Sequence, residues 1–200
     1  MSQPLHSDAQ LDALREVANI GCGHAANALS RLMGGRKVDL SIPRVLLTGP
    51  SDAAELLGGA APVVSGWLGI QGGLRGALLL VLPQQDGAAL EALLLEGQPV
   101  IHQAERDSVM AETANIVASA CLSAMGRMTG WKLVPTVPTV RRGRARDVVS
   151  DVVGQVEGDA SSVVVLEARF LATAAPPVGG QLLLVLARDS IRDLLARLGV

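Results

Sequence analysis

The chain has 200 residues, of which 49% are hydrophobic and 2% aromatic, with no tyrosine. A hydrophobic core must therefore be built from leucine, valine and alanine, and the length fits one domain or two small ones. The formal net charge of −2 gives no general attraction to nucleic acid or to an anionic membrane surface.

Neither the N-terminus nor any apolar run predicts a targeting or membrane-spanning segment. The first ten residues are polar and lack a basic region followed by an apolar stretch, so they do not form a signal peptide. The longest apolar runs, 77–82 and 182–187, are far shorter than the ~20 residues of a membrane helix. Cys22 and Cys121 are far apart and outside any CxxC motif, which favours buried, reduced thiols. We therefore expect a cytoplasmic protein without membrane insertion.

The first half of the sequence predicts a helix, a strand, a short helix, two strands and a helix. Ser7 and Gln10 fit a capping box that starts the first helix, which ends at the glycine pair 34–35. In the following strand, 37–47, Pro43 limits pairing, so we expect a sheet edge or a strand end. The other elements are a short helix at 51–57, strands at 63–70 and 74–82 around a glycine turn at 71–73, and a helix at 85–95.

The second half repeats this order with its own variations. A helix at 108–128 is followed by a strand at 132–140 that contains Pro135 and Pro138. The arginine-rich run at 141–146 is expected to be a solvated loop. The remaining elements are strands at 147–157, 162–172 and 181–187 and a helix at 190–198.

Similar strands in the two halves indicate an internal duplication, since GALLLVL at 76–82 is matched by GQLLLVL at 180–186. Each half has too little core to be stable alone, so we expect the strands to merge into one mixed sheet with helices packed against it. The expected fold class is α/β (α+β). It forms a single domain over 1–200 with two pseudo-symmetric halves at approximately 8–98 and 104–200.

The two long helices share a polar signature at the same spacing. At about 100° per residue, the four polar or small positions of each helix fall within an arc of roughly 60°, opposite an apolar side. Each helix is therefore amphipathic, and its polar face carries a carboxylate followed three residues later by an amide. The matched positions are Asp12, Glu16, Asn19 and Gly23 in the first helix, and Ser108, Glu112, Asn115 and Ser119 in the second.

The Glu-x-x-Asn pair has both a structural and a chemical explanation. A carboxylate near a helix N-terminus is favoured by about 0.3–1 kcal/mol, whereas asparagine inside a helix costs roughly 0.6 kcal/mol relative to alanine. A solvated face therefore does not explain an asparagine in both helices. An amide can hold a water molecule without removing its proton. Phosphoryl transfer needs mainly such positioning, so each pair fits half of an active site that another protein completes.

The repeated pattern Asp/Ser-x-x-x-Glu-x-x-Asn, followed after a gap by proline, resembles the CheC-type chemotaxis phosphatases of the CheC/CheX/FliY group. The resemblance covers nearly the whole chain. Asn115 and Pro138 are separated by 22 residues, as in the family pattern, whereas Asn19 and Pro43 are separated by 23. We expect the glycine pair 34–35 to absorb the additional residue, which leaves the Glu/Asn geometry intact.

The resemblance implies an enzyme, a hydrolase that removes the aspartyl phosphate of a CheY-like response regulator in two-component chemotaxis signalling. Asn19 and Asn115 would orient the attacking water, and Glu16 and Glu112 would pair with a lysine of the regulator. The Mg²⁺ would belong to the regulator, so the chain is expected to have no metal site or cofactor of its own. The resemblance also implies a CheD-like deamidase as a second partner. The remaining positions of the signature are expected to contact the regulator, namely Asp12, Gly23, Ser108 and Ser119.

Other classes of function stay open at this point. A non-enzymatic adaptor or flagellar-switch-like domain could use the same fold to bind CheY-like or CheD-like partners, although the retention of both Glu/Asn pairs favours the enzyme. A small-molecule-binding domain would need a polar pocket that the sequence does not reveal. The run 141–146 lacks interleaved aromatic residues and is poor evidence for nucleic-acid binding. The adjacent Cys22 and His24 point to different helix faces and do not form a metal site.

Overall fold

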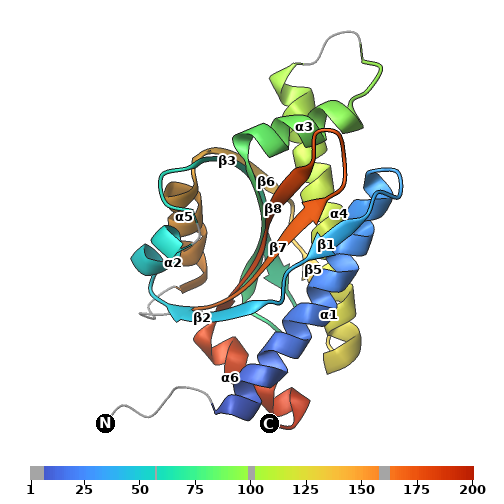
Figure 1. Cartoon of the computed structure of the whole chain (residues 1–200). Coiled ribbons are helices and arrows are strands. Elements are labelled where there is room, and N and C mark those ends of the chain that lie inside the picture. The colour runs from blue at the N-terminus through green and yellow to red at the C-terminus, as the bar shows by residue number, and fades with distance from the viewer. Residues whose placement is uncertain (1–6, 57, 99–101, 158–162) are drawn as a thin grey trace.

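The structure, a computed structural model, describes residues 7–56, 58–98, 102–157 and 163–200 (Figure 1). The N-terminal segment 1–6 and the expected element ends at 57 and 162 lie outside the described residues. The first half consists of α1 (Asp8–Leu32), β1 (Val38–Leu40), β2 (Arg44–Thr48), α2 (Pro50–Leu56), β3 (Pro62–Gln71), β4 (Gly76–Pro83) and α3 (Gln84–Leu94). The second half consists of α4 (Gln103–Thr129), β5 (Val134–Pro135), β6 (Thr139–Arg144), α5 (Ala145–Glu157), β7 (Val163–Ala172), β8 (Val178–Ala187) and α6 (Arg188–Leu198).

The two halves share one eight-stranded sheet and exchange strands within it. The order is β1-β7-β8-β4-β3-β5, with β2 also pairing with β7 and β6 also pairing with β3. The first two strands of each half thus pair with the hairpin of the other half. At the centre, β4 and β8 pair around Leu79 and Leu183, which are equivalent positions in the repeated GALLLVL and GQLLLVL segments. This exchange explains why the duplication produces one domain.

Every strand pairing among the described residues is antiparallel, whereas a mixed sheet was expected from the sequence. The α/β class, with helices packed on one sheet, is confirmed. The purely antiparallel order follows from the hairpins and from the pseudo-twofold relation between the halves. A twofold axis normal to the sheet reverses strand direction, so the two central strands β4 and β8 must be antiparallel.

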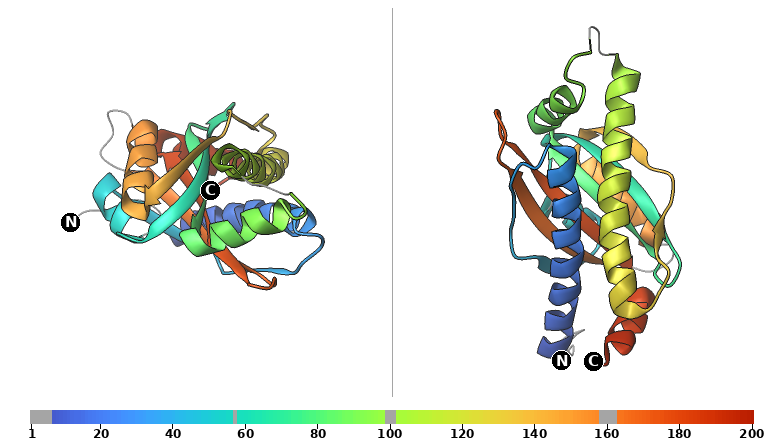
Figure 2. Two further views of the ribbon diagram at one scale, coloured as in Figure 1. Left: turned by 90° about the horizontal axis from the view of Figure 1, so that it is seen from above. Right: turned by 90° about the vertical axis from the view of Figure 1, so that its right-hand side faces the viewer.

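Helices cover both faces of the sheet (Figures 1 and 2). The long helices α1 and α4 lie side by side and antiparallel on one face, and α2 packs against α5 on the other. Side chains of β4 alternate between the two cores, with Leu78 and Leu80 under the long helices and Leu79 under α5. Burial on both faces explains why the central strands are continuous apolar runs.

The expected strand at 147–157 is wrong, because this segment is the helix α5. Its valines suggested a strand, since β-branched residues favour strands. Their spacing is that of a helix face, however, and burial of that face decides the outcome. The buried valines are Val148, Val149, Val152, Val153 and Val156.

The solvated loop expected at 141–146 is also wrong, because residues 141–144 belong to β6. Exposed arginines on this edge strand are satisfied by acidic partners. Arg141 pairs with Asp151 at 2.9 Å and Arg144 pairs with Asp147 at 2.8 Å, both on α5. The expected strands 37–47 and 132–140 are present but interrupted, since each is divided into two short strands at its bend.

In the described part of the chain, α4 alone is long and apolar enough to cross a membrane by length and composition. Of the qualifying window, 56% is buried inside the fold. The core helix of a soluble protein meets the same two criteria, so the finding is weak evidence for a membrane span.

Candidate functional site on the two long helices

The structure places the sequence signature on the outer surface of α1 and α4. We call Asp12, Glu16, Asn19 and Gly23 the α1 stripe, and Ser108, Glu112, Asn115 and Ser119 the α4 stripe. Asp12, Glu16, Asn19, Ser108 and Glu112 are exposed, and Gly23, Asn115 and Ser119 are half-buried. The Ser7 and Gln10 capping box that starts α1 is confirmed, with the Gln10 N–H donating to Ser7 Oγ at 3.2 Å.

The functional groups of the two Glu/Asn pairs are left without internal partners. Among the described residues, no hydrogen bond or ion pair engages the side chains of Glu16, Asn19, Glu112 or Asn115. Their stripe neighbours differ, since Asp12 accepts a hydrogen bond from Arg15 at 2.9 Å and Ser108 donates to the Ala104 carbonyl at 2.8 Å. The carboxylates and amides are therefore available to a partner molecule.

Close packing fixes the relative position of the two helices. A Cβ on Gly21 would lie 2.9 Å from the sulfur of Cys121 and 3.3 Å from Met125 Cγ, so this crossing requires glycine. On the other side of α4, a Cβ on Gly66 of β3 would overlap the Cβ of Ala114. Both glycines let a site helix approach its support directly.

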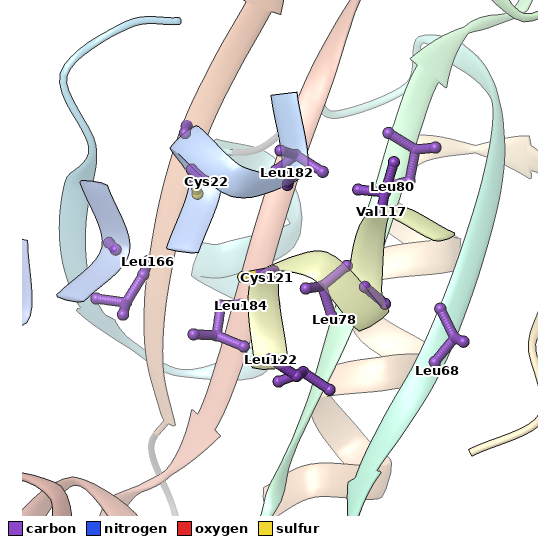
Figure 3. Packing of buried hydrophobic residues seen from close by; sticks show 14 of the residues in the cluster. Cys22, Leu68, Leu78, Leu80, Val117, Cys121, Leu122, Leu166, Leu182 and Leu184 are labelled. Carbon is purple, nitrogen blue, oxygen red and sulfur yellow. The ribbon is translucent and has the colours of Figure 1, made fainter. Parts of the chain in front are cut away.

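The two cysteines are packing groups in this interface (Figure 3). Burial raises the pKa of the Cys22 thiol to about 12. Burial, and secondarily the neighbouring Cys22, raises the pKa of Cys121 well above its usual range. The thiols are therefore neutral and are not nucleophiles near neutral pH, as expected for buried, reduced cysteines.

The two Glu/Asn pairs are well separated along the helices. From the contact between Gly21 and Cys121, the α1 pair lies about four residues toward the start of α1, and the α4 pair about eight residues toward the start of α4. Because the helices are antiparallel, these displacements add to about twelve residues, or roughly 18 Å at 1.5 Å per residue. The site is therefore present twice, at two distinct places on one surface.

Each stripe leans toward the outer edge of the sheet. Ser30 lies within about 20° of Asn19 around α1, and it donates a hydrogen bond to the Arg36 carbonyl at 2.6 Å, just before β1. Gly126 has the same angular relation to Asn115, and a Cβ there would lie 2.6 Å from the Trp131 carbonyl oxygen, just before β5. Asn19 thus faces the β1–β2 edge, and Asn115 faces the β5–β6 edge.

The spacing between asparagine and proline has a geometric reason. From Asn19 to the end of α1 the chain advances roughly 20 Å along the helix. The strand then returns by about 20 Å over the six residues 38–43, so this count predicts that Pro43 is roughly level with Asn19. The same count brings Pro138 level with Asn115. The additional residue of the first half is confirmed in the turn, where Gly34 and Gly35 have φ of 71° and 81°, whereas the second turn has one such glycine, Gly130 at 72°.

An ionic cluster that was not predicted from the sequence supports the start of α4. The carboxylate of Glu91, on α3, is buried and pairs with Arg142 at 2.7 Å and with Arg106 at 3.2 Å. Arg142 also pairs with Asp107 at 2.9 Å. Burial acts to lower the pKa of Arg142, but its hydrogen bonds to Glu91 and Asp107 outweigh this effect and raise it. The sequence signal that could have revealed this cluster is the position of Glu91, which falls on the apolar side of α3 beside Gly87 and Leu90.

A surface groove continues the α4 stripe toward β5. Its lining includes Ser119, Ser123, Arg127, Trp131 and Lys132. Among the residues described in 7–200, no cluster of three or more histidine, cysteine, aspartate or glutamate side chains is arranged to hold a metal ion. The arrangement therefore provides carboxylates and amides on a helical surface, and its chemistry requires groups from a partner.

Comparison with known proteins places the chain in a family. A model of the CheC-like family matches residues 10–47, which include the first Glu/Asn pair and Pro43. Over 150 residues the chain is 33% identical to "CheY-P phosphatase CheC" of Bacillus subtilis (strain 168), covering 72% of this chain and 71% of that protein. The chain belongs to the CheC-like family.

Two further relatives of this CheC-like chain carry the name FliY. "Flagellar motor switch phosphatase FliY" of Bacillus subtilis (strain 168) is 33% identical over 91 residues, which cover 46% of this chain and 23% of that protein. The crystal structure of Thermotoga maritima FliY matches with a TM-score of 0.78 at 19% identity and covers 98% of both chains. This structural likeness supports the fold of the whole CheC-like chain.

Proposed function

We propose that this CheC-like protein is a phosphatase that hydrolyses the aspartyl phosphate of a CheY-like response regulator. The observation that carries the proposal is the pair of Glu/Asn sets on the outer surface of α1 and α4, whose polar groups have no partner within the described structure. The names of the two Bacillus subtilis relatives, a CheY-P phosphatase and a motor switch phosphatase, agree with it.

In the proposed mechanism the protein supplies positioning groups. Glutamate and asparagine three residues apart on a helix lie about 5–6 Å from each other at Cβ, so both reach one small area of a docked regulator. Glu16 or Glu112 pairs with a lysine of the regulator and fixes the helix over the aspartyl phosphate. Asn19 or Asn115 then holds the attacking water in line through its amide donor and acceptor.

The remaining groups of the reaction belong to the regulator. Mg²⁺ bound there neutralises charge on the transferring phosphoryl group, and the CheC-like chain contributes no metal in this proposal. Asp12, Gly23, Ser108 and Ser119 line the contact area. A cytoplasmic location and a CheD-like deamidase as second partner are further proposals, which rest on the family resemblance.

The experiment measures the decay of a phosphorylated CheY-like regulator with and without the protein. Wild type should accelerate the decay, and the Asn19→Ala/Asn115→Ala double variant should lose the acceleration while keeping its melting temperature. Asn27→Ala is the matched control, because Asn27 is an exposed asparagine of α1 outside the stripe. Full activity in the double variant would refute the assigned roles.

A non-enzymatic adaptor or flagellar-switch-like domain is the second candidate, favoured by the motor-switch name of the FliY relative. Such a domain would bind a CheY-like or CheD-like partner without turnover. Regulator binding with unchanged phosphate decay would establish this alternative and reject the phosphatase.

A further inference from the structure

Two apolar side chains are exposed to an unusual degree at equivalent positions of the two halves. Ile42 is 84% exposed and Val137 is 85% exposed, whereas the other exposed large hydrophobic residues among the described positions reach at most 54%. Ile42 directly precedes Pro43, and Val137 directly precedes Pro138. We call Ile42 and Val137 the bulge tips. Folding gains nothing from either side chain, since burial in the native state is what rewards an apolar group.

Each bulge tip lies on a β-bulge with the same register. On β7, Phe170 pairs with Leu40 and Glu167 pairs with Arg44, so the three residues 41–43 lie opposite only two residues of β7, 168 and 169. On β3, Ile70 pairs with Pro135 and Trp67 pairs with Thr139, so the three residues 136–138 again lie opposite only two residues, 68 and 69. One additional residue in each edge strand forces the bend.

Side-chain hydroxyls hold both bulges in place. The Ser41 N–H donates to the Arg169 carbonyl at 2.8 Å, and the Arg169 N–H donates back to Ser41 Oγ at 3.0 Å. The Thr136 N–H donates to the Gly69 carbonyl at 2.9 Å, and the Gly69 N–H donates back to Thr136 Oγ1 at 2.8 Å. Each hydroxyl takes the place of a main-chain carbonyl, so the ladder stays satisfied while the next residue is pushed into solvent.

The bulge tips are positioned beside the Glu/Asn pairs. The residue count predicts Pro43 and Pro138 roughly level with Asn19 and Asn115, and α1 contacts β1 and β2 as α4 contacts β5 and β6. Figure 2 (right) shows the β1–β2 segment along the outer side of α1 and the β5–β6 segment along the outer side of α4. Each half therefore combines one carboxylate, one amide and one apolar tip on one surface.

We propose that Ile42 and Val137 are apolar docking contacts for the response regulator, each becoming buried against the regulator bound at the same half. This inference rests on the proposed function and adds a residue that recognises the substrate protein. An exposed ion pair contributes little to affinity, and interfaces gain most from apolar anchors that become buried.

The regulator is the occupant because the tips are duplicated together with the Glu/Asn pairs. Another feature beside the pairs is not duplicated, since the α1 stripe ends in Gly23 and the α4 stripe in Ser119. A docking residue for a partner that binds elsewhere would not need to occur once beside each Glu/Asn pair.

The test isolates one site at a time. In an Asn115→Ala background only the α1 site can act, and there Ile42→Ser should raise the KM for the phosphorylated regulator at least fivefold with kcat within twofold. Ile42→Leu should restore the KM. In an Asn19→Ala background the effect should move to Val137→Ser. Leu47→Ser is the control, since Leu47 is a 39% exposed leucine on β2, five residues and roughly 16 Å along the strand from Ile42.

Affinity for the regulator loaded with beryllofluoride, a stable phosphoryl analogue, should fall in parallel with the rise in KM. An unchanged KM for Ile42→Ser, while wild type still accelerates decay, would overturn the docking inference and leave the proposed function standing. No acceleration by wild type would instead reject the proposed function. A change in oligomeric mass by light scattering without a change in KM would assign the tips to self-association and also overturn the inference.

Discussion

The contact between the two site helices should weaken at alkaline pH, because it contains two thiols that are stable there only when neutral. In the folded protein burial raises the pKa of Cys22 to about 12, and that of Cys121 is also raised well above its usual range. In the unfolded chain both return to the ordinary value of 9.0. The perturbation is therefore a rise in pH from 7 to 10.

The expected loss follows from proton linkage. Below pH 9 both states keep the thiols protonated, so the stabilising contribution is fully present. Above pH 9 the unfolded state loses two protons that the folded state retains until pH approaches the folded pKa values, so stability falls in this window. At pH 10 the loss amounts to roughly 3 kcal/mol for the two thiols together, a substantial part of the 5–15 kcal/mol typical of a domain.

Few other side chains titrate near pH 10, so the effect of the two thiols on stability can be measured separately. The sequence has no tyrosine, and its lysines are limited to Lys37 and Lys132, both exposed. Urea unfolding between pH 7 and pH 10, in the presence of a reductant, should show the free energy of unfolding falling above pH 9. The Cys22→Ala/Cys121→Ala variant should be less stable at pH 7 but nearly flat over this range. An equal pH slope in wild type and variant would refute the reasoning.

Two further predictions concern the support of the site helices. Gly66→Ala should destabilise the protein by about 1–3 kcal/mol in urea unfolding, because the new Cβ overlaps Ala114 and forces α4 away from the sheet. The control is Gly143→Ala, where a Cβ has no neighbour within 4 Å. An equal loss of stability in both variants would contradict the close packing of Gly66 against Ala114. Glu91→Gln should cost about 1.5–3 kcal/mol, because it removes the charged, buried acceptor of hydrogen bonds from Arg106 and Arg142. The control is Asp189→Asn, which breaks an exposed pair with Arg192 and should change stability by less than about 1 kcal/mol. A loss of less than about 1 kcal/mol for Glu91→Gln as well would contradict the stabilising role of Glu91.

Local sequence signals predicted the long helices and the stripes well. The Ser7 capping box, the glycines after α1 and α4, and the glycine turn between β3 and β4 are short-range features, and such features act within a few residues. The outward-facing Glu/Asn positions followed from helical periodicity, although Asn115 is half-buried. Their catalytic and binding roles stay predictions until the variants are measured.

Long-range features could not be read from the sequence. Nothing local says that β1 pairs with β7 of the other half, because strand partners are chosen by the packing of the whole sheet. The α5 segment was mistaken for a strand because its valines favour one state and their spacing favours another. Ile42 continues the alternation of Val38 and Leu40 with polar residues, which is typical of a half-buried strand. Only the register of the bulge explains why Ile42 is exposed.

The most direct test of the central claim is the release of inorganic phosphate with the phosphorylated regulator in large excess over the CheC-like protein. The account predicts many turnovers per molecule for wild type, and only the spontaneous rate for the Asn19→Ala/Asn115→Ala variant at unchanged melting temperature. Equal rates for wild type and variant, whether both fast or both spontaneous, would contradict the claim that the asparagines of the two helices position the attacking water.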